Sequence, residues 1–172
     1  MAEDPPVRDL VPSAASPRAG ILHVMDFNGT TLEQLSRDEC LRLVGQVPLG
    51  RIVYTRQALP AVELVNFALD GGDIIIRTDS GGKLAAATRG AVVAFEADNV
   101  DTVTHAGWSV TIVGYSRAVT DGPEIRHLEE SGLVSWAPGK HDHFIRISPE
   151  IVNGRRISAR VQLTGDRDAG SI

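Results

Sequence analysis

The chain has 172 residues, with 17 basic and 22 acidic side chains and a net charge of -5 at neutral pH. That length predicts a single domain, because domains commonly run to about 100 to 200 residues. The acidic balance argues against duplex nucleic acid or an anionic membrane as the main partner. Hydrophobic residues make up 42% of the chain, which is ordinary for a protein with a buried core.

Cysteine content and apolar segments bear on the compartment. The single Cys40 excludes an intramolecular disulfide and every multi-cysteine metal site. The first twenty residues carry acidic side chains and prolines and have no apolar segment of the length that a signal peptide requires. No stretch approaches the roughly 18 apolar residues that span a bilayer. We therefore expect a soluble protein of the reducing cytoplasm.

Composition divides the chain into a body and two tails. Residues 1–31 are rich in proline, alanine, serine and aspartate, and residues 159–172 lose hydrophobic periodicity. We expect the N-terminal tail to be disordered and the C-terminal residues to form a second tail. Between them, residues 32–158 contain short apolar runs separated by glycine, proline and aspartate, a pattern typical of a β-rich domain.

The first predicted element of the body is a helix. Ser36 and Glu39 form a capping box, in which the serine hydroxyl accepts from the backbone N–H of the glutamate. An apolar stripe follows, which turns Cys40 towards the core, and Gly45 ends the helix.

The remaining elements are mostly strands, separated by turn residues at 57–60 and 69–72. In a longer pair of strands, Trp108 and Val110 lie on one face and Ser109 on the other. The final strand ends before Pro149 and is followed by a turn at residues 153–154. Six or seven strands with small helices predict a mainly β fold, a closed or split β-barrel. Strands are expected at 49–54, 61–67, 73–77, 91–96, 107–119 and 142–147, and short helices at 83–88 and 123–130.

Residues 76–84 carry the clearest chemical signal. They run from the end of a strand through a glycine turn to a helix N-terminus, where free backbone N–H groups favour an anion. Arg77, Thr78, Ser80 and Lys83 add two positive charges and two hydroxyl groups, so the segment outlines a phosphate site. Alternatively, Asp79 or Ser80 only caps the helix. The segment matches neither a Walker loop nor a dinucleotide fingerprint, which favours this alternative.

Histidines and tryptophans give weaker signals. His141 and His143 share one face of a strand, but two histidines without a third ligand are a poor metal site, and we predict none. Trp108 and Trp136 either fill a core or line the site of a planar ligand.

Short motifs follow one another over the whole body. They are GRI at 50–52, LPAV at 59–62, VNF at 65–67, RT at 77–78, GKL at 82–84, VAFEAD at 93–98, GWSV at 107–110, WAPG at 136–139 and RRI at 155–157. In the order and spacing of these motifs, the chain resembles the flavin-binding split-barrel proteins related to pyridoxamine 5'-phosphate oxidase, over about residues 35 to 157. This resemblance implies a six-stranded split barrel, a homodimer, and FMN bound in a groove between the two subunits.

The resemblance also implies a cofactor site made from three stretches of the chain. One stretch holds the phosphate, the second runs along the isoalloxazine ring, and the third completes the pocket, which Trp136 could cover from the partner subunit. Relatives often have a proline where this chain has Glu63-Leu64, and alternation places Glu63 on the face opposite Asn66. The cofactor-binding residues implied are Val62, Val65, Asn66, Arg77, Thr78, Ser80, Gly82, Lys83, Leu84, Trp108, Ser109 and Val110.

Three functions are compatible with this resemblance. The first is an FMN-dependent oxidoreductase acting on a small planar, nitro- or quinone-like substrate, without a catalytic side chain because the flavin performs the chemistry. The second is a reductase that uses a deazaflavin, and the third is a non-catalytic protein that binds flavin or haem. Pyridoxamine phosphate oxidase activity itself is not expected, because the segment at His141 follows Trp136, whereas the corresponding basic segment of such enzymes precedes the tryptophan.

Overall fold

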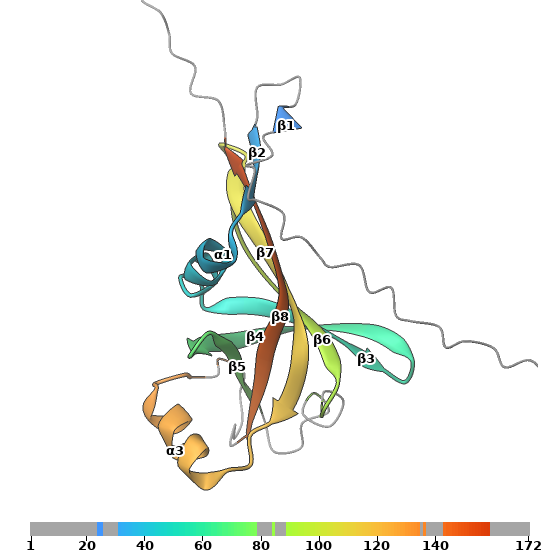
Figure 1. The fold of residues 1–172 in the computed structure, drawn as a ribbon, viewed down its shortest axis with the longest axis vertical. Helices are drawn as coiled ribbons and strands as arrows, with labels where there is room; N and C mark the ends of the chain where they lie inside the picture. The colour runs from blue at the N-terminus through green and yellow to red at the C-terminus, as the bar shows by residue number, and fades with distance from the viewer. Residues whose placement is uncertain are drawn as a thin grey trace, which may run out of the picture.

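The fold is an antiparallel β-barrel with two helices on its outside (Figure 1). The computed structural model describes residues 24–25, 31–78, 84, 89–134, 136 and 143–158. Within them lie the helices α1 (Arg37–Val44) and α3 (Gly122–Glu130). The strands are β1 (Val24–Met25), β2 (Thr31–Leu35), β3 (Leu49–Arg56), β4 (Leu59–Asp70), β5 (Asp73–Thr78), β6 (Val92–Asp101), β7 (Ala106–Ala118) and β8 (His143–Ser158).

Six of the strands close into a ring. The sheet order is β1-β2-β8-β5-β4-β3-β6-β7, and β7 also pairs with β8, so β3 to β8 form a closed barrel. The predicted mainly β, six-stranded split barrel is confirmed. Strand β2 lies beside β8 outside the ring, and β1 pairs with β2 inside the stretch that composition marks as a tail. None of the helices in the described parts of the chain is long and apolar enough to cross a membrane.

Strand β8 holds the barrel together along its whole length. Its first residues pair with β5, its last residues pair with β2, and β7 runs beside it from Gly107 to Ala118. The predicted end of this strand at residue 147 is therefore wrong. Pro149 lies where the β7–β8 register shifts between Val113 and Gly114, and such an irregularity accommodates a residue that has no N–H to donate.

The predicted turn at residues 153–154 is also wrong, because both residues lie inside β8. Gly154 is needed there for close packing. A Cβ atom at this position would lie 2.4 Å from Sγ of Cys40 and 3.2 Å from side-chain atoms of Leu35 and Val110. The missing side chain lets α1 pack directly on the strand.

Strand β7 is one continuous strand of 13 residues, where the sequence predicted a pair. The expected alternation is nevertheless confirmed, since Trp108 and Val110 are buried in the barrel and Ser109 is half-buried on the other face. The predicted 57–60 turn is shorter than expected: it contains only Gln57 and Ala58, both with positive φ. Most of the helix predicted at 83–88 lies outside the described residues.

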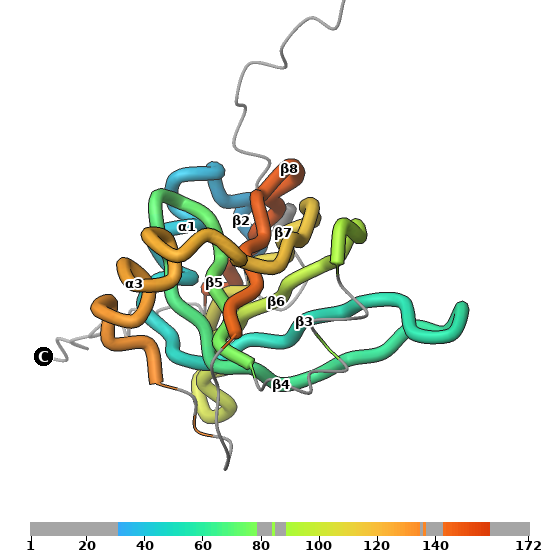
Figure 2. The backbone as a smooth tube through the Cα atoms, turned by 90° about the horizontal axis from the view of Figure 1, so that it is seen from below, coloured from blue at the N-terminus to red at the C-terminus, as the bar shows by residue number. Residues whose placement is uncertain are grey.

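Local signals place both helices as the sequence predicts. Ser36 Oγ accepts from the backbone N–H of Glu39 at the start of α1, and Asp121 caps α3 in the same way. The barrel interior forms one buried cluster, which includes Cys40 of α1. A second buried cluster lies between α3 and the barrel. It consists of Ile75, Val119, Leu128, Leu133 and Phe144. The β3–β4 hairpin projects away from both helices (Figure 2).

We expect Gly154→Ala to lower the free energy of unfolding by about 2 kcal/mol, because the added methyl group overlaps Cys40 in a filled core. Urea unfolding measures the loss. Gly122→Ala is the matched control, since a Cβ there meets only the end of Arg126 at 3.5 Å. Cys40→Ala should relieve part of the loss in the double variant; additive effects would show that the overlap is not the cause.

Candidate functional site

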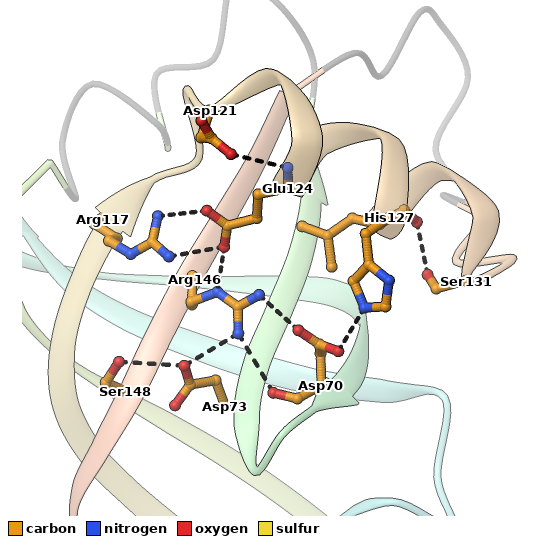
Figure 3. Close-up of polar contacts among 10 residues, drawn as sticks. Asp70, Asp73, Arg117, Asp121, Glu124, His127, Ser131, Arg146 and Ser148 are labelled. Carbon is orange, nitrogen blue, oxygen red and sulfur yellow. Dashed lines mark hydrogen bonds and ion pairs between the residues drawn. The ribbon is translucent and has the colours of Figure 1, made fainter.

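A partly buried arginine joins β8 to three other elements (Figure 3). The Arg146 side chain is only 11% exposed. Its Nη2 lies 2.6 Å from Oδ2 of Asp70, its Nη1 lies 3.1 Å from Oδ2 of Asp73, and its Nε lies 2.7 Å from Oε1 of Glu124. These carboxylates come from the end of β4, the start of β5 and the first turn of α3. We call these four side chains the Arg146 cluster.

Two further side chains extend the Arg146 cluster. Arg117 binds Glu124 through two hydrogen bonds of 3.0 and 2.7 Å, and Nε2 of His127 lies 3.0 Å from Oδ1 of Asp70. Hydrogen bonds from His127 and Arg146 lower the pKa of the Asp70 carboxyl. Hydrogen bonds from Arg117 and Arg146 lower the pKa of Glu124 in the same way. Helix α3 thus contacts the barrel through Glu124 and, one turn later, through His127 (Figure 3).

The chain that leaves α3 returns over β4 and leaves a pocket of about 300 Å³. The pocket is lined by Pro48, by β4 residues 66–68, by residues 131–134 and by Trp136. None of these lining residues carries a charge. Its position depends on the Arg146 cluster, because that cluster fixes the helix from which the lining segment departs.

Asn66 closes one side of the pocket. Its Oδ1 accepts a hydrogen bond of 2.8 Å from the backbone N–H of Trp136, and its Nδ2 donates to the carbonyl of Pro48 at 3.4 Å. The backbone of Trp136 is therefore held by Asn66 of the same chain, and its cover of a partner subunit's pocket stays a prediction. Its side chain stays largely exposed, as does that of Val134.

Arg77 lies beside the same pocket. Its Nη1 donates a hydrogen bond of 3.0 Å to the carbonyl of Leu133, and its guanidinium carbon lies 5.4 Å from the ring centroid of Phe144. Thr78 is buried and, by alternation along β5, faces the barrel interior. The two side chains that the resemblance assigns to one phosphate thus lie on opposite faces of the strand.

The other residues of the expected site are distributed as follows. Ser80, Gly82 and Lys83 lie outside the described residues, and Leu84 is buried in the barrel core. Val62 is exposed on the outer face of β4, the face that also carries Asn66, whereas Val65 packs against the core. Trp108 and Val110 are core residues, and only Ser109 of that stretch lies on the outer face.

Glu63 lies on the inner side of the β3–β4 hairpin. The Tyr54 hydroxyl donates a hydrogen bond to its Oε1, and Tyr54 itself is buried. Glu63 thus has a partner on the face opposite Asn66, as alternation predicts. Burial and this contact with Glu63 raise the pKa of the tyrosine hydroxyl.

The outer face of the barrel carries an apolar row that crosses five strands, exposed at its two ends and half-buried between them. Its residues are cross-strand partners in register: Val62, Val53, Ala94, Val113 and Ile151. Beside the row, Leu64 is 63% exposed, and Nη1 of Arg51 lies 2.9 Å from Glu96 and 2.8 Å from Asp98. The face therefore combines apolar side chains with ion pairs between Arg51 and the carboxylates of Glu96 and Asp98.

No group of three His, Cys, Asp or Glu side chains that could hold a metal ion occurs in the described parts of the chain. His143 is exposed at the start of β8 and pairs in register with Thr78. His141 lies outside the described residues.

Comparison with known proteins assigns the family. Residues 36–156 match the family model described as pyridoxamine 5'-phosphate oxidase. This chain belongs to the pyridoxamine 5'-phosphate oxidase family. An uncharacterised protein of Mycobacterium tuberculosis is 40% identical over 131 residues, which make up 73% of this chain and 86% of that protein.

Two solved structures extend the family likeness. A FAD-binding protein of Mycobacterium smegmatis is 32% identical, with a TM-score of 0.57, covering 73% of this chain and 97% of that one. A candidate pyridoxamine 5'-phosphate oxidase of Corynebacterium glutamicum is 31% identical, with a TM-score of 0.68, covering 81% of this chain and all of that one. The pyridoxamine 5'-phosphate oxidase family to which this chain belongs is thus one of flavin-binding split barrels.

Replacing Arg146 should strongly destabilise the protein. Arg146→Met leaves three carboxylates without their shared cation, and we expect the free energy of unfolding to fall by about 3 kcal/mol at neutral pH. Arg117→Met is the control, because that guanidinium is 51% exposed and pairs only with Glu124; its loss should cost about 1 kcal/mol or less. Denaturant titration of both variants measures the difference, and equal losses would contradict the central role of Arg146.

Acid should weaken the wild-type protein through the same cluster. Asp70 and Glu124 have folded-state pKa values below their ordinary 3.8 and 4.5, so at acid pH the unfolded chain binds more protons than the folded one. The stabilisation is present above the ordinary values and is lost as the pH falls through the folded ones. Denaturant titrations between about pH 5 and pH 3 give the free energy of unfolding at each pH. This free energy should fall less steeply with decreasing pH in Arg146→Met than in the wild type.

Proposed function

We propose that this protein is a flavin-dependent oxidoreductase that binds FMN between the two subunits of a homodimer and acts on a small planar substrate. The observation that carries the proposal is the position of Arg77. Its side chain binds the carbonyl of Leu133, a residue that lines the pocket beside Asn66. A cationic group and a pocket for a flat ring are thus joined at one place, within a family of flavin-binding proteins.

The pocket fits part of a flavin nucleotide. About 300 Å³ is at the lower end of the range for small-molecule sites, which suits a flat ring system but leaves the rest of a nucleotide outside. Its apolar lining and the exposed indole of Trp136 suit an isoalloxazine ring. Arg77, with Lys83 as its expected partner, would take the phosphate.

When bound, the flavin supplies hydride and electron transfer. The side chains of the chain would bind and orient it: Arg77 would neutralise phosphate charge, and Trp136 would cover the ring. No catalytic side chain is assigned. We also propose a cytoplasmic location, where a reducing environment keeps the single buried Cys40 as a thiol.

The apolar row supports a dimer. Val62 and Ile151 are 60% and 55% exposed at its two ends, Leu64 beside it is 63% exposed, and exposed apolar side chains that gather on one face mark an interaction site. Ser109 lies three strands from Asn66, or about 14 Å along the sheet. A second copy of the chain, packed on this face, can bring its own Ser109 to the ligand beside Asn66.

Flavin binding is tested first by the visible spectrum of the purified protein and by titration with FMN. We expect flavin bands or micromolar binding, and an affinity at least about ten-fold lower in Arg77→Ala, because one charge-assisted contact is lost. Arg42→Ala is the control, since Arg42 is an exposed cation of α1. Parallel titrations with FAD and a deazaflavin identify the cofactor. Tighter binding of FAD or of a deazaflavin than of FMN would contradict the FMN assignment. Failure to bind any of the three would contradict it as well.

The dimer is tested by sedimentation velocity. The wild type should sediment as a dimer, and Leu64→Glu with Ile151→Glu should sediment as a monomer, because burying two carboxylates in an apolar interface is costly. Val103→Glu is the control, since Val103 is 87% exposed at the tip between β6 and β7. A monomeric wild type that binds flavin normally would refute the shared site.

A further inference from the structure

We propose that Asn66 is a positioning residue that holds Trp136 in place, and that the Trp136 indole is the wall against which a flat ring ligand stacks. The inference rests on the proposed flavin binding and assigns the two residues different roles. Asn66 acts through the backbone of Trp136, whereas Trp136 touches the ligand directly.

Both polar atoms of the Asn66 side chain are already engaged within the protein. Its carbonyl accepts from the Trp136 backbone at 2.8 Å, and its amide donates to the carbonyl of Pro48 at 3.4 Å. These contacts connect β4 to the chain before β3 and to the segment after α3, three places far apart in the sequence. The amide group therefore serves to assemble the pocket.

Two backbone groups of the chain after α3 are held by the barrel. The Leu133 carbonyl accepts from Arg77 of β5, and the Trp136 N–H donates to Asn66 of β4. Because these contacts exist without a ligand, less conformational entropy is lost at these two residues when a ligand binds.

The Trp136 indole itself stays uncovered. It is 64% exposed at the rim of the pocket, although its backbone is fixed. Trp108, in contrast, is 9% exposed in the barrel core. A fixed backbone that presents a large aromatic face to a cavity suits stacking with a planar ring. The uncharged lining, with Arg77 beside it, favours a ring that is neutral or attached to an anionic group.

A double-variant cycle with FMN as the probe tests both roles. Asn66→Ala and Trp136→Ala should each weaken binding by about ten-fold, the scale of one lost aromatic contact. The double variant should bind no worse than Trp136→Ala alone, because Asn66 acts through the indole. Trp136→Phe keeps a ring at this position and should retain most of the affinity, which guards against a general loss of folding.

Tryptophan fluorescence gives a second readout. FMN should quench the emission of the wild type strongly and that of Trp136→Phe weakly, since only the buried Trp108 then remains. Additive losses in the cycle would overturn the positioning role of Asn66. FMN binding that is unaffected by Trp136→Ala would overturn the stacking role and leave the proposed function standing. A wild type that binds no flavin would overturn both.

Discussion

The candidate site depends on one partly buried cation. Arg146 would cost several kcal/mol to remove from water without partners, and its three carboxylates come from β4, β5 and α3. Because those partners are distant in the sequence, satisfying the charge docks α3 onto the barrel. The segment that leaves α3 can then return over β4, where Asn66 and Arg77 bind its backbone. The pocket is a consequence of that docking.

Alternation and capping explain why the architecture could be predicted. The faces of β7 follow from the spacing of Trp108 and Ser109, and the start of α1 follows from Ser36. The end of β8 could not be read in the same way. Proline and glycine at 149 and 154 suggest a break and a turn from local preference alone, but a register shift accommodates Pro149 and contact with Cys40 explains Gly154. Their roles are tertiary.

The contrast between local sequence signals and tertiary contacts also applies to the candidate site. Asn66 and Trp136 line the pocket and lie in motifs that resemble a family, and Arg77, which the polar segment 76–84 also indicates, lies beside it. Pro48 and residues 131–134 of the lining carry no chemical signal in the sequence. Arg146 likewise looks like any charged residue of a strand until its three partners converge. Motifs therefore indicated part of the site, whereas long-range ion pairs shaped its walls.

The pairing of β8 with three strands has a consequence for biosynthesis. The ring cannot close until residues 143–158 have left the ribosome, because they alone join β5 to β7. Before that point, the nascent chain exposes two unpaired strand edges, which are templates for misassembly between chains. The sheet contacts with the largest sequence separation must form last, which predisposes this barrel to slow folding.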